Sequence, residues 1–195
     1  MSTDGSSNSA ESELAVAVFC GSSTGAKDRY VACARAVGRE LARQRVTLVY
    51  GGAGIGLMGE LADACLAAGG RVVGVIPSLL AELELAHPGL SELHVVDSMA
   101  ERKALMAELA QGFLALPGGY GTLDEAFEMV TWRQLGLHPG PLVFVNVDGY
   151  FDGLRAFLDR ATADGLISAR NRELAMFAAD EAEGVRHLLW ALGRS

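Results

Sequence analysis

Short apolar runs alternate with segments of helical spacing from one end of the chain to the other. Runs of strand length lie at residues 14–19, 46–50, 71–76, 93–96, 113–116 and 142–146, with a weaker one at 174–177. Segments of helical spacing lie between most of them, at residues 27–44, 56–68, 98–111, 122–136, 150–164 and 180–192. Several of the apolar runs are uninterrupted, as is typical of strands that are covered on both faces.

This alternation predicts an α/β fold with a doubly wound, mainly parallel sheet and helices on both faces. A chain of 195 residues can build one sizeable core but is short for two domains. We therefore expect a single domain over residues 13–195, preceded by a disordered, Ser-rich tail at residues 1–12. In such sheets, ligands bind beyond the carboxyl ends of the strands, so the functional residues should directly follow strands.

Two segments rich in glycine or hydroxyl groups follow the first two predicted strands. The first is CGSST at residues 20–24, where Gly21 and Ser22 could contact a ligand or cap the next helix. The second is GGAGIGLMG at residues 51–59, which contains the pattern G-x-G-x-x-G. Here Gly52 and Gly54 could contact a nucleotide, or the glycines could serve only a tight turn and close helix packing. No acidic residue follows the next strand near Ile76, which disfavours binding of NAD in the usual Rossmann manner.

A third segment, after the fifth predicted strand, reads PGGYGTLDE at residues 117–125. Its glycines allow close approach to the backbone, and the free N–H groups and dipole of the following helix favour an anion such as phosphate. Glu125 could reach the sugar attached to that phosphate, although Thr122 and Glu125 also match the T-x-x-E pattern of a capping box.

One predicted helix carries two cations beside two methionines. Met99, Arg102, Lys103 and Met106 are spaced at i, i+3, i+4 and i+7 and share one face. The methionines are expected in the core, with Met99 also a possible ligand contact. The two cations could pair with carboxylates, lie at a solvated edge of the protein, or bind an anionic ligand.

The connection at residues 77–91 is unusually long, which is typical of a lid, and its Glu84 could contact a ligand.

Composition excludes several classes of protein. A net charge of −8 argues against a nucleic-acid partner, and the apolar runs are too short to span a membrane. The cysteines Cys20, Cys33 and Cys65 form no C-x-x-C pair, so we expect reduced, mostly buried thiols and a cytoplasmic protein. The four histidines lack the spacing of a helical metal site, and we expect neither a metal nor a cofactor.

The motifs together resemble those of the LONELY GUY family of cytokinin-activating enzymes, which an older naming labels lysine-decarboxylase-like. The resemblance rests on PGGYGTLDE, on MAERK at residues 99–103, on YGGAGIGLMG at residues 50–59 and on CGSS at residues 20–23. It extends through TWRQLGLH at residues 131–138 and NVDGY at residues 146–150, and covers residues 16–177. Several motifs in one order are far more specific than any one of them.

The resemblance implies a modified Rossmann fold and a homodimer with active sites near the subunit interface. It also implies hydrolysis of the N-glycosidic bond of a cytokinin riboside 5′-monophosphate, which yields the free cytokinin and ribose 5-phosphate. Arg102 and Glu125 match the residues assigned to catalysis in that family. The substrate contacts that it implies are Glu84, Arg102, Lys103, Gly119, Tyr120, Gly121, Thr122, Glu125 and Thr131.

Two other functions remain open from the sequence. One is a broader glycosylase acting on AMP and other nucleoside 5′-monophosphates. The other is a non-catalytic module that binds a nucleotide or carries the molybdenum cofactor, although the joint presence of Arg102 and Glu125 favours an enzyme. Lysine decarboxylation is disfavoured, because it normally needs a lysine bound to pyridoxal phosphate and the chain contains only Lys27 and Lys103.

Overall fold

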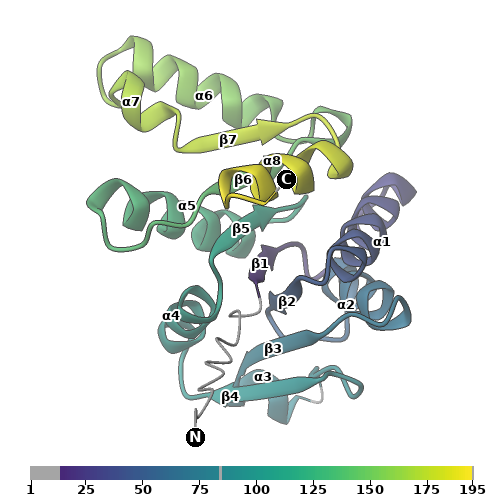
Figure 1. Ribbon diagram of the computed structural model, residues 1–195. Coiled ribbons are helices and arrows are strands. Elements are labelled where there is room, and N and C mark those ends of the chain that lie inside the picture. The colour runs from purple at the N-terminus through teal and green to yellow at the C-terminus, as the bar shows by residue number, and fades with distance from the viewer. Residues whose placement is uncertain (1–13, 84, 195) are drawn as a thin grey trace, which may run out of the picture.

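The fold is a single parallel sheet covered by helices on both faces (Figure 1). The computed structural model describes residues 14–83 and 85–194, so the predicted tail at residues 1–12 and Glu84 lie outside the described residues. The strands are β1 (Ala15–Phe19), β2 (Thr47–Tyr50), β3 (Val72–Pro77), β4 (Glu92–Val96), β5 (Gly112–Ala115), β6 (Leu142–Val145) and β7 (Ala175–Ala178).

The seven strands are ordered β4-β3-β2-β1-β5-β6-β7, and every neighbouring pair is parallel. The chain builds the sheet outward from β1 to β4 and then returns to the other side of β1 with β5. The order therefore reverses between β1 and β5, and in open α/β sheets ligands bind at such a switch point. This arrangement confirms the predicted doubly wound α/β fold.

The main helices form two layers. They are α1 (Asp28–Arg43), α2 (Gly56–Ala67), α4 (Met99–Leu109), α5 (Tyr120–Leu135), α6 (Asp152–Ala163) and α8 (Glu181–Ala191). Helices α1, α2 and α8 cover one face of the sheet around a core that includes Val16, Leu48 and Leu114. Helices α4, α5 and α6 cover the other face around Ala17, Phe113 and Phe144 (Figure 1). Adjacent strand residues thus point to opposite cores, as strand geometry requires.

Three short elements were not predicted from the sequence. These are α3 (Ser78–Glu82), α7 (Ala169–Arg172) and the 3₁₀ turn η1 (Val147–Gly149). None is long enough to show a helical repeat of apolar residues, which is the signal that the other helices carry. Helix α3 lies in the connection at residues 77–91 that was predicted to be a lid.

Two expectations about side chains meet different outcomes. All three cysteines are free and buried, as predicted. Met106 is buried in the core, but Met99 is 46% exposed, so the prediction of a core position for Met99 was wrong. Met99 is the first residue of α4. Among the described residues, no helix combines the length and the apolar character needed to cross a bilayer.

Candidate active site

A cavity of about 370 Å³ opens at the switch point, beyond the carboxyl ends of β1 and β5. It is bounded by the loops that follow β1 and β2, by α3 and by the start of α5. The lining residues are Val18, Phe19, Cys20, Gly21, Ser22, Gly51, Met58, Leu80, Arg102, Gly119, Tyr120, Gly121, Thr122 and Glu125. We call this space the catalytic cavity.

The amino terminus of α5 faces the catalytic cavity without a side-chain cap. The N-cap is Gly119, and no side chain accepts a hydrogen bond from the first turn. The first backbone bond of the helix runs from the Leu123 N–H to the Gly119 carbonyl at 3.1 Å. The three preceding amides, at residues 120–122, have no hydrogen-bond partner among the described residues. They and the helix dipole form a ready site for an anion.

Helices α1, α2 and α6 also lack a side-chain cap, whereas α4 and α8 have one. The Ser98 hydroxyl accepts a hydrogen bond from the Glu101 N–H at the start of α4, and the Asp180 carboxylate does the same for Glu183 at the start of α8. A capping box at Thr122 and Glu125 is not formed, because α5 begins two residues before Thr122. The carboxylate of Glu125 bonds elsewhere.

Arg102 and Glu125 form a buried ion pair in the catalytic cavity. The Nη1 of Arg102 donates to Oε1 of Glu125 at 2.8 Å, and both side chains are less than one-tenth exposed. The Nε of Arg102 also donates to the carbonyl oxygen of Val75 at 3.1 Å. Helix α4 and helix α5 thus bring together two charges that are 23 positions apart in the chain.

Burial raises the pKa of Glu125, because a buried carboxylate loses its hydration. The guanidinium of Arg102 is the second influence and acts in the opposite direction, since it stabilises the charged form. Burial also raises the pKa of the neighbouring Cys20 thiol, and the charge of Glu125 adds to that rise. Cys20 is therefore an uncharged wall of the cavity and not a nucleophile.

Lys103 does not line the catalytic cavity. Its Nζ lies 2.9 Å from Oδ2 of Asp124 and 3.1 Å from Oε2 of Glu128, on the adjoining face of α5. The hydrogen bond to Asp124 raises the pKa of Lys103, which keeps the ammonium charged. Both cations of this helix face therefore have carboxylate partners, which was one of the alternatives left open by the sequence.

The glycines after β2 shape the loop more than they line the cavity. Gly51 lines it, but Gly52 and Gly54, predicted as possible contacts, do not. Gly52 has a positive φ of 76°, and a Cβ on Gly59 would come 2.5 Å from the carbonyl oxygen of Gly54. The alternative of a tight turn with close helix packing therefore accounts for the pattern G-x-G-x-x-G.

The same loop also holds the segment after Glu84. The Gly54 N–H donates to the Leu85 carbonyl at 2.9 Å, and the His87 N–H donates to the Gly52 carbonyl at 2.9 Å. Nε2 of His87 lies 3.0 Å from Oδ1 of Asp63 on α2, while its Nδ1 accepts a hydrogen bond from the Gly89 N–H at 3.0 Å. This anchoring was not predicted from the sequence.

Eight of the residues proposed from the sequence meet in the catalytic cavity. They are Gly21, Ser22, Arg102, Gly119, Tyr120, Gly121, Thr122 and Glu125. Thr131 is exposed on α5, and neither it nor Met99 lines the cavity. Sequence reasoning missed Cys20, Gly51, Met58 and Leu80. Cys20 and Gly51 carry a usable signal, because each is the first residue after a strand at the switch-point edge.

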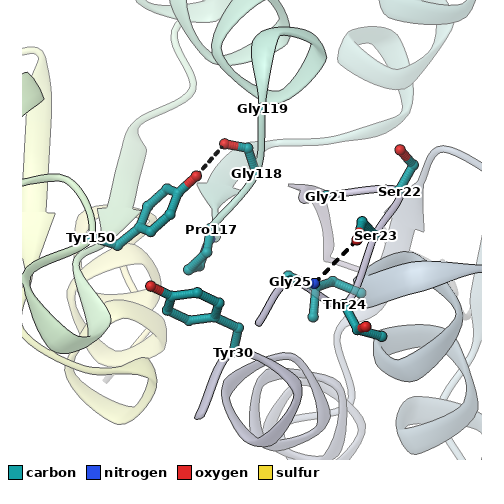
Figure 2. Close-up of a pocket in the computed structure, with 11 residues that line it drawn as sticks. Gly21, Ser22, Ser23, Thr24, Gly25, Tyr30, Pro117, Gly118, Gly119 and Tyr150 are labelled. Atoms are coloured by element: carbon teal, nitrogen blue, oxygen red, sulfur yellow. Dashed lines mark hydrogen bonds between the residues drawn. The ribbon is translucent and has the colours of Figure 1, made fainter. Parts of the chain in front are cut away.

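The described residues hold no group of three His, Cys, Asp or Glu side chains that could bind a metal ion. A second cavity, drawn in Figure 2, shares Gly21, Ser22 and Gly119 with the catalytic cavity. It is lined mainly by aromatic and apolar groups.

Known proteins resemble this chain over most of its length. Residues 58–188 match the family described as "Possible lysine decarboxylase". A probable cytokinin riboside 5′-monophosphate phosphoribohydrolase of Oryza sativa subsp. japonica is 49% identical over 173 residues, or 89% of this chain and 76% of the relative. A cytokinin riboside 5′-monophosphate phosphoribohydrolase of Rhodococcoides fascians is 49% identical over 166 residues, or 85% and 84%. A cytokinin riboside 5′-monophosphate phosphoribohydrolase of Arabidopsis thaliana is 45% identical over 173 residues, which is 89% of this chain and 80% of the relative.

Solved structures share the fold at low sequence identity. The molybdenum cofactor carrier protein of Chlamydomonas reinhardtii superimposes with a TM-score of 0.69 at 19% identity, covering 93% of this chain and 99% of that chain. The molybdenum cofactor binding protein of Rippkaea orientalis gives a TM-score of 0.71 at 17% identity, covering 92% and 98%. At this identity the likeness concerns the fold alone.

Proposed function

Because the chain belongs to the LONELY GUY family of cytokinin riboside 5′-monophosphate phosphoribohydrolases, we propose that it hydrolyses the N-glycosidic bond of these nucleotides. The products are the free cytokinin and ribose 5-phosphate. The observation that carries this proposal is the buried pair of Arg102 and Glu125 in the same cavity as an uncapped helix terminus. A sugar phosphate requires both features at once, an anion site and a carboxylate near the sugar.

The 5′-phosphate lies at the start of α5 in this proposal. Its oxygens accept hydrogen bonds from the free amides at residues 120–122, and the hydroxyls of Ser22 and Thr122 border the same space. Glu125 follows one turn further along α5, which is the distance that separates a 5′-phosphate from the ribose ring. Phosphate binding therefore positions the reacting bond, and nucleosides without the phosphate are poor substrates.

Glu125 acts on the ribose in its ionised form. Cleavage of the bond from C1′ to the base builds positive charge on the sugar, and a carboxylate beside it stabilises that charge. Glu125 also accepts a proton from the attacking water as the water oxygen bonds to C1′. The bonding electrons leave with the base, which takes up a proton in turn. Burial favours the uncharged carboxyl, so the charge of Arg102 is needed to keep Glu125 ionised.

Arg102 has an electrostatic role. A guanidinium remains protonated at all relevant pH values and is not a proton donor to the leaving base. Its Nε and Nη1 are engaged by Val75 and Glu125, which leaves Nη2 for the substrate. The base meets apolar walls at Met58 and Leu80, which suit a planar purine with an apolar substituent.

The lysines of the chain do not fit a decarboxylase. Pyridoxal phosphate needs a lysine amine that can lose its proton to form a Schiff base. Lys103 is bound by two carboxylates, and the hydrogen bond to Asp124 raises its pKa, which is the opposite of what that chemistry requires. Lys27 is exposed before α1, outside the catalytic cavity.

The protein acts as a homodimer in this proposal. Thr131 lies two turns beyond Glu125 on α5 and points to solvent, so it can contact substrate only in the cavity of a second subunit. Leu135 and Leu137, near the same end of α5, are 63% and 68% exposed and offer apolar surface for that contact.

The three free, buried thiols support a location in a reducing compartment, the cytoplasm.

The test is a chromatographic assay of base and ribose 5-phosphate released from a panel of nucleotides. The panel contains isopentenyladenosine monophosphate, AMP and isopentenyladenosine without phosphate. The proposal predicts turnover of the first, slower turnover of AMP and little turnover of the nucleoside. Equal rates for the first two would favour the broader nucleoside-monophosphate glycosylase, and no release from any of them would contradict the proposal.

A further inference from the structure

A second cavity, of about 300 Å³, lies next to the catalytic cavity and has a different lining. Tyr30 of α1, Tyr150 and Pro117 form one wall, and the loop at residues 22–25 forms the other (Figure 2). Its size is at the lower end of small-molecule sites. We call it the tyrosine cavity.

The two tyrosine rings are held in place by contacts within the protein. They meet edge to face with centroids 5.3 Å apart, and the Tyr150 hydroxyl donates to the Gly118 carbonyl at 2.7 Å (Figure 2). Fixed rings offer apolar surface at little cost in side-chain entropy, which suits an aromatic ligand.

The tyrosine cavity and the catalytic cavity share Gly21, Ser22 and Gly119. These residues surround the end of the catalytic cavity where the 5′-phosphate is proposed to bind. A group attached to that phosphate therefore leads away from Glu125 and into the tyrosine cavity. The hydroxyl groups of Ser22, Ser23 and Thr24 border this route and can donate to a further phosphate.

A cation lies beside the tyrosine cavity. The Lys27 ammonium is 5.6 Å from the centre of the Tyr30 ring and forms no salt bridge with a described carboxylate. A second negative charge near Tyr30 would be attracted to it. The lining thus combines aromatic faces, hydroxyl donors and a neighbouring positive charge.

We propose that the tyrosine cavity binds the second half of a dinucleotide joined through a 5′,5′-diphosphate, with its adenylate half in the catalytic cavity. The first phosphate lies at the start of α5, the second passes Gly21 and Ser22, and the distal base packs against Tyr30 and Tyr150. Dinucleotides bind across the switch point of many doubly wound sheets, and here one cavity lies on each side of the loops after β1 and β5. A dinucleotide therefore competes with the monophosphate substrate.

The inference rests on the proposed phosphate position, so its test measures binding and does not depend on turnover. Isothermal titration calorimetry on the full-length Glu125→Gln protein keeps the ligands intact. The ligands are AMP, ADP-ribose and diadenosine diphosphate. The last two differ in that only diadenosine diphosphate carries a second base, so their affinities isolate the contribution of the tyrosine cavity.

We expect diadenosine diphosphate to bind at least about tenfold more tightly than ADP-ribose, because stacking a base on an aromatic side chain contributes a gain in affinity of this order. Adding Tyr30→Leu removes this advantage and leaves the affinity for AMP unchanged. Phe157→Leu, which removes an exposed ring on α6, is the matched control and keeps the advantage. If Tyr30→Leu does not fold, Tyr150→Leu removes the other ring of the cavity and should have the same effect.

Equal affinities for ADP-ribose and diadenosine diphosphate would overturn the inference, as would an advantage that survives both Tyr30→Leu and Tyr150→Leu. Failure of the proposed function looks different. In that case the unsubstituted protein releases no base from any monophosphate, whatever the calorimetry shows.

Discussion

Arg102 reaches Glu125 from α4 by passing over the backbone at the ends of β2 and β3. A Cβ on Gly51 would fall well inside contact distance of Arg102 Nη2, and the Val75 carbonyl fixes Nε on the other side. Gly51 is therefore required at the end of β2 by the side chain that crosses it and not by its own backbone conformation. Any larger residue displaces the guanidinium from the catalytic cavity.

We predict that Gly51→Ala lowers kcat by about 100-fold, as expected for a misplaced catalytic group, and destabilises the fold by about 1–3 kcal/mol through overpacking. Arg102→Ala removes the side chain that the new methyl group meets. The two changes should thus be non-additive, with Gly51→Ala costing almost nothing in stability or kcat in the Arg102→Ala background. Urea unfolding and turnover assays on the four proteins measure this.

The matched control for Gly51→Ala is Gly153→Ala on α6, where a Cβ meets nothing within 4 Å. Gly153→Ala reports the effect of replacing a glycine by alanine where no side chain is displaced, and it should leave turnover intact. Additive effects of Gly51→Ala and Arg102→Ala would show that Gly51 does not act through the guanidinium.

The charge of Glu125 links stability to pH. Burial raises the pKa of Glu125 above its unfolded-state value. The protonated carboxyl then contributes stability that is fully present below the unfolded pKa and is lost as pH rises through the folded pKa. Glutamine does not titrate. We therefore predict that the free energy of unfolding of wild type, minus that of Glu125→Gln, falls as pH rises from about 4. Urea unfolding across this range measures it, and a difference that grows with pH would refute the direction.

Among the elements, α5 combines two roles. Its start is open to a ligand, whereas α4 and α8 are capped by Ser98 and Asp180. One turn later the same helix presents Glu125 to Arg102. A rigid helix therefore fixes the distance between the proposed phosphate site and the carboxylate, which a flexible loop would not do.

The segment after Glu84 is held through His87, so we predict that His87→Ala loosens this connection. The change removes the bonds to Asp63 and Gly89 and should cost about 1–3 kcal/mol. Amide exchange at residues 85–90 should accelerate, and KM should rise more than kcat falls, because Glu84 is a proposed substrate contact. Exchange measured by mass spectrometry tests this. His187→Ala on the exposed face of α8 is the control, and unchanged exchange in His87→Ala would contradict the prediction.

At the scale of elements, the sequence predicts regular structure better than the geometry of a loop. Helix α5 was predicted over residues 122–136 and is found at Tyr120–Leu135, because its apolar repeat runs along its whole length. The four-residue α7 has no such repeat and was missed. The start of α5 was also placed two residues late, which is why a capping box at Thr122 remained open.

The candidate site was only partly predictable, for a related reason. Arg102 and Glu125 could be singled out by motif, but their pairing depends on how α4 and α5 pack across the sheet. Lys103 stands next to Arg102 in sequence, yet it turns to Asp124 and Glu128 outside the cavity. Met58 and Leu80 are ordinary apolar residues in sequence, and only the fold brings them to the cavity.

In the whole molecule, both cavities lie at the switch point between β1 and β5, beyond the carboxyl ends of these strands. The proposed dimer adds a second subunit through the far end of α5. We predict that Leu135→Asp combined with Leu137→Asp yields monomers, because the charges oppose burial of this surface. Size-exclusion chromatography with light scattering measures the mass.

The control for the dimer is Leu166→Asp, since Leu166 is 83% exposed beyond α6 and should leave the dimer intact. Turnover should fall with the loss of the dimer, because the proposed contact of Thr131 comes from the other subunit. A double Leu135→Asp, Leu137→Asp protein that remains dimeric would place the interface elsewhere.

The most direct measurement of the central claim is release of isopentenyladenine from isopentenyladenosine monophosphate by wild type and by Glu125→Gln. Glutamine keeps an oxygen that can accept the Arg102 hydrogen bond but cannot carry the charge or accept the proton. We predict that wild type releases base and sugar phosphate in equal amounts, and that Glu125→Gln, still folded, is slower by at least about 100-fold. Wild-type turnover in folded Glu125→Gln would contradict the account.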